Sequence, residues 1–282
     1  YVENSKQSSP PYPINKLRNI ALLGASMRRK DGWVFILDAD ARPSFNMNLA
    51  QRQLNSALDL GNGPPDFLPF HERTAFVIPA FESTLRNQEK ILKVKNKHQL
   101  RKRMTVGEAI IMHADYFPAS YVGPLDPWDW ALAGSPYEVK YTSRWEPYFF
   151  ARLPIPLFDE RFVDRGLNKA QHQFTMFSMG YRYIVMPEMF ISDAHVHSAS
   201  SGQRKIHFIL LDKLWPMFVQ ETLDKVGMSC EARVRQRRVA AIFEPNCHRI
   251  DFMPGKSAAS GVAMSSTLPE DHNQYLPGNG RA

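Results

Sequence analysis

Residues 33–37 (Trp-Val-Phe-Ile-Leu) constrain the fold of this chain more than any other segment. Five apolar residues stand together, and Asp38 and Asp40 follow them at once. An apolar run of this length is typical of a short, fully buried strand. Buried carboxylates are costly unless cations meet them, and α/β folds place ligand sites at the carboxyl ends of strands. The segment therefore predicts that Asp38 and Asp40 hold a divalent metal that carries a diphosphate.

A second interpretation of this segment remains open. Asp-Ala-Asp is a common kind of tripeptide, and the Ala-Arg-Pro-Ser that follows it is typical of a turn. On this interpretation the two carboxylates belong to a solvated loop. The apolar run before them favours the metal site, because it supplies the strand that such a site needs.

Helical and strand patterns alternate along the rest of the chain. Helices are expected at residues 13–23, 49–60, 168–179 and 206–226, and strands at 74–80 and 181–186. This alternation predicts an α/β layered domain. After about residue 255, Ser, Gly, Pro and Asn dominate, and this composition predicts a disordered tail.

The composition narrows the classes of partner. The chain has 282 residues and a formal net charge of +7, which favours acidic partners such as nucleotide diphosphates, uronic acids or nucleic acid. No apolar stretch is long enough to span a membrane. Cys230 and Cys247 leave both a disulfide and two free thiols open, and no Cys/His zinc pattern occurs.

Residues 83–103 are polar and strongly basic, with Lys93, Lys95 and Lys97 at alternate positions. One interpretation is an anion-binding lid or a nucleic-acid patch. The other is a solvated helix face, which we favour because charge runs usually have that role.

A second cluster of polar residues follows the strand expected at 181–186. Histidines are common metal ligands, and His195 and His197 alternate, so in an extended segment both point the same way. They could complete a metal site begun by Asp38 and Asp40. The alternative is a surface loop with two ordinary histidines.

Six segments together resemble a known enzyme family. They are Y-P-I-N-K-L-R-N-I-A at 12–21, L-D-A-D-A-R-P-S at 37–44, A-F-V-I-P-A-F-E at 75–82, W-E-P-Y at 145–148, F-D-E-R-F at 158–162 and G-L-N-K at 166–169. The ordered set resembles the LARGE-type and β-1,4-glucuronyltransferase group of inverting glycosyltransferases, family 49, over about residues 11–225.

The resemblance implies a GT-A fold, which is a Rossmann-like mixed sheet flanked by helices. It implies a catalytic domain over residues 1–226 and a C-terminal extension over 227–282. Family members are Golgi membrane proteins with lumenal catalytic domains. Because the chain begins at Tyr1, we expect a fragment whose membrane anchor and first nucleotide-binding strand lie upstream.

The resemblance also implies Mn²⁺, a UDP-glucuronic acid donor and a glycan or glycoprotein acceptor. In the family, two carboxylates and a histidine hold the metal. A gapless alignment puts Asp193 at the histidine position. Of Asp193, His195 and His197, we favour one of the histidines beside Asp38 and Asp40.

The remaining candidate residues lie in the family segments. Glu146 and Asp159 are candidates for the general base that deprotonates the acceptor hydroxyl, and Asp164 is the next candidate after them. Glu146 could instead brace a loop, and Asp159 could simply pair with Arg161.

Arg18 and Asn19, together with Asp38, are the donor-binding candidates, although Arg18 could form a structural ion pair. Lys97 or Lys169 could meet the uronate carboxylate or a phosphate, although most lysines are only solvated.

Two alternatives remain beside a glucuronyltransferase. One is a sister enzyme that uses another UDP-sugar, and the other is an inactive glycan-binding homologue. We expect no nucleic-acid binding, because no aromatic-interleaved DNA or RNA motif supports it.

Overall fold

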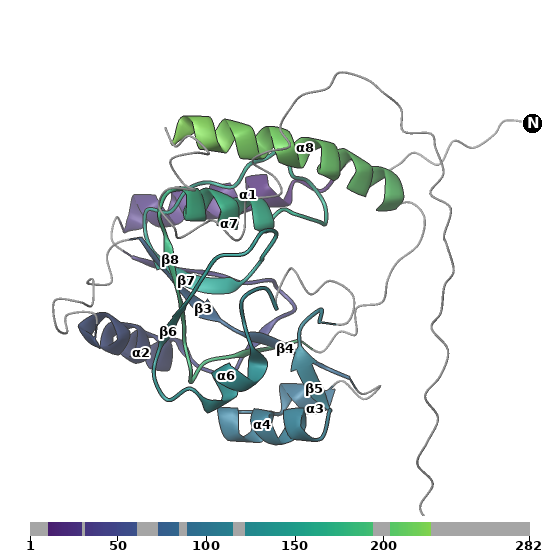
Figure 1. Cartoon of the computed structure of the whole chain (residues 1–282). Coiled ribbons are helices and arrows are strands. Elements are labelled where there is room, and N and C mark those ends of the chain that lie inside the picture. Colours follow the sequence, from purple (N-terminus) through teal and green to yellow (C-terminus); the bar gives the residue numbers. More distant parts are fainter. Residues whose placement is uncertain are drawn as a thin grey trace, which may run out of the picture. The chain divides into compact units, whose positions relative to one another are not determined.

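Two mixed sheets stand at the centre of the fold (Figure 1). The computed structural model describes residues 11–29, 32–60, 73–84, 89–114, 122–193 and 204–226, all within the compact unit Tyr1–Phe243. The five-stranded sheet has the order β1 (Trp33–Ile36), β7 (Tyr148–Arg152), β3 (Thr74–Ile78), β8 (Arg182–Val185) and β6 (Tyr137–Val139). The four-stranded sheet has the order β2 (Arg42–Pro43), β9 (Ile191–Asp193), β4 (Ala80–Ser83) and β5 (Ala109–Ile111).

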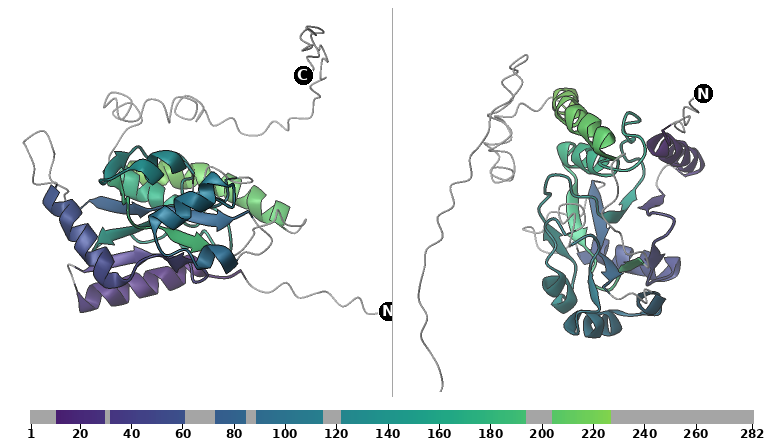
Figure 2. Two further views of the ribbon diagram at one scale, coloured as in Figure 1. Left: turned by 90° about the horizontal axis from the view of Figure 1, so that it is seen from below. Right: turned by 90° about the vertical axis from the view of Figure 1, so that its right-hand side faces the viewer.

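Helices surround these sheets. They are α1 (Ile14–Arg28), α2 (Met47–Leu60), α3 (Glu89–Leu92), α4 (Lys97–Thr105), α6 (Pro127–Leu132), α7 (Ala170–Ser178) and α8 (Arg204–Lys225). In the orientation of Figure 1, α1, α7 and α8 lie in the upper part of the molecule, and α2, α4 and α6 lie in the lower part (Figures 1 and 2). The predicted mixed α/β architecture is confirmed, with helices and strands close to the expected positions. Within the described part of the chain, every helix is too short or too polar to cross a membrane.

The strand expected at 74–80 is in fact two strands, one in each sheet. Pro79 stands between β3 and β4, and having no N–H it cannot continue the ladder as a donor. Its carbonyl accepts a hydrogen bond from Ile191 at 2.9 Å. β3 pairs in parallel with β8 and β4 pairs in parallel with β9, so both chain segments pass together from one sheet to the other.

The expectation that β1 is fully buried is wrong. All four of its residues are half-buried, because β1 lies at the sheet edge and β7 is its only neighbour among the described strands. Its attachment to β7 is nevertheless strong. Phe35 stacks on the fully buried Phe150 with ring centroids 4.1 Å apart, and a buried Phe side chain stabilises a fold by about 1.5–3 kcal/mol.

The predicted boundary between residues 226 and 227 stays a prediction. All of the expected C-terminal extension, residues 227–282, lies outside the described residues, and so do His195 and His197.

Candidate active site

The Asp-Ala-Asp turn links the two sheets. It follows β1 directly, and Ala41 donates a backbone hydrogen bond to the carbonyl of Asp38 at 3.2 Å. β2 comes next and pairs antiparallel with β9, with Arg42 opposite Ser192. This pairing brings the turn beside the end of β9, where Asp193 is buried. The two segments from which the sequence predicts metal ligands are therefore neighbours in the fold.

The donor set at this point fits a hard divalent cation only in part. The carboxylates of Asp40, which is exposed, and Asp193 are of the type that Mn²⁺ or Mg²⁺ takes. Within the described ranges, no group of three acidic, His or Cys side chains could hold a metal. His195 and His197 lie outside those ranges, so the predicted metal set stays a prediction.

Three donors hold the carboxylate of Asp38. Arg18 donates to Oδ1 at 3.1 Å, while the hydroxyl of Tyr148 and the ammonium of Lys169 donate to Oδ2 at 2.9 and 2.5 Å. Burial alone would raise the pKa of Asp38, but Lys169, Arg18 and Tyr148 outweigh it and lower that pKa to about 2. Asp38 is therefore ionised at neutral pH.

Lys169 is a buried cation, with 7% of its side chain exposed. Its ammonium also lies 4.7 Å from the centroid of the Tyr148 ring. Burial alone would lower the pKa of Lys169, but the charge of Asp38 outweighs this effect. The net shift of that pKa is upward, so the lysine stays charged. The loop before α7 delivers it, and this loop turns through positive φ at Gly166 (100°) and Leu167 (55°). Glycine adopts such a φ without cost, whereas leucine does so only when its surroundings enforce it.

Glu146 belongs to the same cluster. It is half-buried and accepts a hydrogen bond from the backbone N–H of Ala170, at the start of α7. Removal from water and the nearby charge of Asp38 raise the pKa of Glu146, while Lys169 and Arg18 act against this rise. A carboxyl group whose pKa is raised toward the working pH is suited to accept a proton.

Arg18 joins α1 to two other segments. Besides Asp38, its guanidinium donates to Asn15 Oδ1 at 3.1 Å and to Asn168 Oδ1 at 2.8 Å. It also lies 5.2 Å from the ring centroid of Phe158. The Arg18 guanidinium is thus fixed in position beside Asp38.

Asn19, a predicted donor-binding residue, faces the protein instead of the Asp38 carboxylate. It is 5% exposed. Its Oδ1 accepts from the backbone N–H of Phe158 at 2.8 Å, and its Nδ2 donates to the carbonyl of Phe158 at 2.9 Å and to Glu160 at 3.0 Å. The amide thus fixes the loop that carries Asp159.

The carboxylate of Asp159 belongs to a different ion-pair network, which links that loop to α8. Its carboxylate contacts Arg161 at 2.6 Å, and the same guanidinium contacts Glu221 at 2.6 Å. Burial would raise the pKa of Asp159, but the hydrogen bonds and charge of Arg161 outweigh it and lower that pKa. Of the two candidate bases, the fold brings Glu146 and not Asp159 beside Asp38. Asp164, the third carboxylate considered, accepts from the backbone N–H of Tyr12 at 2.6 Å.

The two candidate lysines lie in different parts of the fold. Lys169 contacts Asp38, whereas Lys97 lies 5.1 Å from the centroid of the Trp130 ring and donates to the carbonyl of Ala133 at 2.5 Å. Lys97 belongs to α4, in the lower part of Figure 1, and α7 lies in the upper part.

Sequence reasoning missed Tyr148 and Asn168. Tyr148 begins β7 two residues after Glu146, and residues two apart in an extended segment face the same side. That alternation was the available signal, because Tyr148 stands in the same short motif as Glu146.

Comparison with known proteins agrees with the motif resemblance. The chain is 29% identical over 180 residues to the xylosyl- and glucuronyltransferase LARGE2s of Gallus gallus, covering 64% of this chain and 22% of that protein. It is 30% identical over 184 residues to the xylosyl- and glucuronyltransferase LARGE2 of Homo sapiens, covering 65% and 23%. It is 29% identical over 180 residues to the xylosyl- and glucuronyltransferase LARGE1 of Danio rerio, covering 64% and 22%. The chain thus spans less than a quarter of the length of these relatives.

The family comparison covers most of the chain. The family described as "Glycosyl-transferase for dystroglycan" matches residues 2–205, a range that includes all six segments of the predicted resemblance and the whole Asp38 cluster. The chain therefore belongs to this glycosyltransferase family, family 49.

Proposed function

We propose that the chain carries a metal-dependent, inverting glycosyltransferase activity that moves glucuronic acid from UDP-glucuronic acid to a hydroxyl of a glycan acceptor. The observation that carries the proposal is the convergence of four family segments on one carboxylate. Arg18, Tyr148 and Lys169 come from three of these segments and meet Asp38 at the end of β1. Family membership supports sugar transfer, and the names of the relatives support xylose or glucuronic acid as the sugar.

The fold proposal is a GT-A-type domain. A strand that ends in Asp-x-Asp, within a mixed sheet flanked by helices, supports it. The relatives are longer than this chain, so the donor, the acceptor and the Golgi location all belong to the proposal. A location in the Golgi lumen agrees with a glycoprotein as the acceptor.

Within the Asp-Ala-Asp turn we assign different roles to the two carboxylates. Asp38 faces two cations, Arg18 and Lys169, which would repel a divalent ion placed against the same oxygens. We assign Asp38 to positioning, and we assign metal binding to Asp40 with Asp193, His195 or His197. When bound, a divalent metal neutralises the diphosphate leaving group.

Glu146 is the proposed general base. The acceptor hydroxyl gives its proton to the Glu146 carboxylate while its oxygen attacks the anomeric carbon, and the sugar leaves the diphosphate with inversion. The nearby ammonium of Lys169 stabilises negative charge on both Asp38 and Glu146. Lys169 thus opposes the rise in the pKa of Glu146 that burial causes.

A donor panel tests the proposal. UDP release from UDP-glucuronic acid, UDP-xylose and UDP-glucose would be measured with Mn²⁺ and with EDTA, on the wild type and on Asp40→Asn. Asp129→Asn, an exposed aspartate on α6, is the matched control. We expect Mn²⁺-dependent release from UDP-glucuronic acid that the control keeps and Asp40→Asn loses. Release from UDP-xylose or UDP-glucose alone would reassign the donor, and no release from a folded chain would leave the inactive glycan-binding homologue as the better account.

A further inference from the structure

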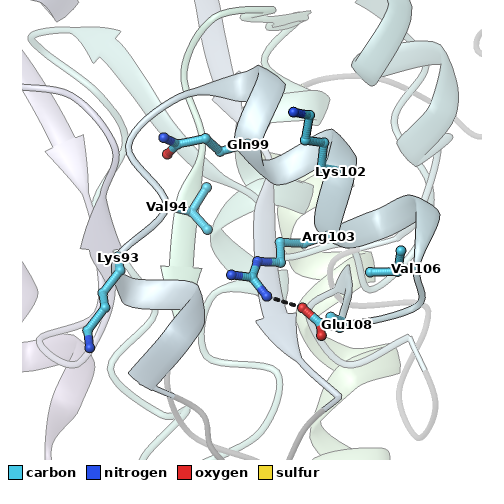
Figure 3. Close-up of a pocket in the computed structure, with 7 residues that line it drawn as sticks. All are labelled: Lys93, Val94, Gln99, Lys102, Arg103, Val106 and Glu108. Carbon is cyan, nitrogen blue, oxygen red and sulfur yellow. Dashed lines mark hydrogen bonds and ion pairs between the residues drawn. The ribbon is translucent and has the colours of Figure 1, made fainter.

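A basic groove lies along α4, in the lower part of the molecule in Figure 1, and Figure 3 shows the residues that line it. Its volume is about 490 Å³, within the range of small-ligand sites. Gln99, Lys102, Arg103 and Val106 line it at positions i, i+3, i+4 and i+7 of the α4 segment, so they share one helix face. Lys93, in the turn before α4, completes its rim.

The charge of the groove is mostly positive, because its lining residues include three cations, Lys93, Lys102 and Arg103, and one acid, Glu108. Residues 90–107 contain seven Lys or Arg residues and no acidic residue. Arg103 forms an ion pair with Glu108, and Lys97 lies 3.9 Å from Glu188. Lys93 and Lys102 take part in no ion pair with any residue that the structure describes. The two lysines therefore leave a positive surplus at the groove.

The groove also offers an apolar surface. Figure 3 shows Val94 at its centre, between Gln99 and Arg103, and Lys93 and Lys102 on different sides. Val94 is 8% exposed and Val106 is 68% exposed. Cations around an apolar floor suit a ligand with separated carboxylates on C–H-rich rings. Base stacking requires aromatic side chains, and none of the groove-lining residues is aromatic.

We propose that the α4 groove binds an acidic oligosaccharide through its uronate carboxylates. Lys93 and Lys102 pair with carboxylates, and Val94 and Val106 contact the sugar rings. The inference rests on the proposed function, because a glucuronyltransferase acts on chains that carry or acquire uronic acid. The groove would hold a part of the acceptor away from the reacting hydroxyl.

The direct test is binding of a labelled hexasaccharide of alternating glucuronate and N-acetylglucosamine to the full chain, measured by fluorescence anisotropy. A neutral N-acetylglucosamine hexasaccharide is the comparison ligand. The groove variant is Lys93→Glu/Lys102→Glu. The control variant is Lys140→Glu/Lys213→Glu, which changes the net charge equally at exposed lysines outside the groove.

We expect the acidic ligand to bind and the neutral one to bind at least tenfold more weakly. The groove variant should lose about tenfold in affinity for the acidic ligand, and the control variant less than twofold. Binding should weaken between 50 and 200 mM salt. Lys93→Gln/Lys102→Gln, checked by thermal melting, replaces the charge-reversed variant should that one unfold.

Equal losses in the groove and control variants would overturn the proposal, because net charge alone would then explain binding. Tighter binding of a single-stranded oligonucleotide of equal charge at the same lysines would overturn it too, in favour of nucleic acid. Asp40→Asn separates the two proposals, since it should abolish transfer and leave hexasaccharide binding unchanged. If sugar transfer occurs but hexasaccharide binding does not depend on the groove lysines, only the proposal for the α4 groove is refuted. If the groove binds the hexasaccharide but no transfer occurs, only the proposed function is refuted.

Discussion

The ammonium of Lys169 lies 2.5 Å from Oδ2 of Asp38, although 131 residues separate them in sequence. The pair joins the Asp-Ala-Asp turn to the loop before α7. Glu146 lies close enough for its pKa to respond to both charges. The turn, the Glu146 segment and the α7 loop are therefore one electrostatic unit.

Lys169→Met should destabilise the fold and abolish transfer. It leaves Asp38 and Glu146 without the buried cation that they share, and breaking a buried pair from one side costs about 3–5 kcal/mol. Urea denaturation would measure the change in the free energy of unfolding, with the exposed Lys140→Met as the control. A loss below about 1 kcal/mol would mean that the pair is no more than a surface contact.

Glu146→Gln should lower kcat by about 10²–10⁴ while UDP affinity changes less than twofold, because the amide cannot accept the acceptor proton. Asp159→Asn is the comparison variant and should keep most of kcat. Steady-state kinetics at saturating donor would measure both. A severe loss of kcat in Asp159→Asn alone would reverse the assignment of the base.

The acid limb of the pH profile of kcat should follow Glu146. Burial raises its pKa, so the carboxylate required as base should be lost at a higher pH than an ordinary glutamate would be. Rates at constant ionic strength between pH 4 and 8 would locate the limb. An acid limb at or below the ordinary Glu pKa would contradict a role for this residue.

Asn19→Leu should lower stability without changing UDP affinity. The buried amide makes three hydrogen bonds to residues 158–160, and unsatisfied buried polar groups cost about 1–3 kcal/mol each. Thermal melting and UDP titration would be carried out on the same sample. A variant that keeps its melting temperature and loses UDP affinity would restore Asn19 as a donor-binding residue.

His172 should make the fold sensitive to mild acid. It is fully buried, stacks on Phe158 and contacts the carbonyl of Pro156 at 2.7 Å, and burial lowers its pKa to about 4. Below pH 6.5 the unfolded chain takes up a proton at this histidine while the folded chain does not. Stability is therefore present above pH 6.5 and is lost as the pH falls toward 4, by about 3 kcal/mol in all.

The pH range separates this effect from that of Asp38. The lowered pKa of Asp38 supplies stability above its ordinary value of 3.8, which is lost only as the pH falls toward 2. Unfolding free energies of the wild type and His172→Gln would be compared between pH 7 and 5. Equal slopes for the two proteins would show that His172 titrates alike in the folded and unfolded states.

Local sequence patterns predicted most of the helices and strands at nearly the right residues. The apolar run before Asp38 predicted β1, and the expected helices and strands correspond to α1, α2, α7, α8, β3 and β8. Pro79 was a visible signal for the break between β3 and β4. The burial of β1 was predicted wrongly, because a strand's place in a sheet depends on pairing with distant segments such as β7.

The sequence identified the chain segments that form the candidate site, but it did not identify the role of each residue in them. The ordered motifs indicated the family, which the comparison confirmed. Glu146 and Asp159 were equal candidates for the base in sequence. The pairing of Asp159 with Arg161 was one of the predicted alternatives and is confirmed, whereas only the tertiary fold places Glu146 beside Lys169. Tyr148 acquires its role from Asp38, 110 residues away, and no local pattern reports such a contact.

Isothermal titration of UDP, with and without Mn²⁺, tests most directly the claim that the Asp-Ala-Asp turn is a metal-dependent nucleotide site. The proteins would be the wild type, Asp40→Asn and the control Asp129→Asn. We predict binding that requires Mn²⁺, persists in the control and is lost in Asp40→Asn. Mn²⁺-dependent binding that Asp40→Asn retains, or no binding by a folded wild-type chain, would contradict the account.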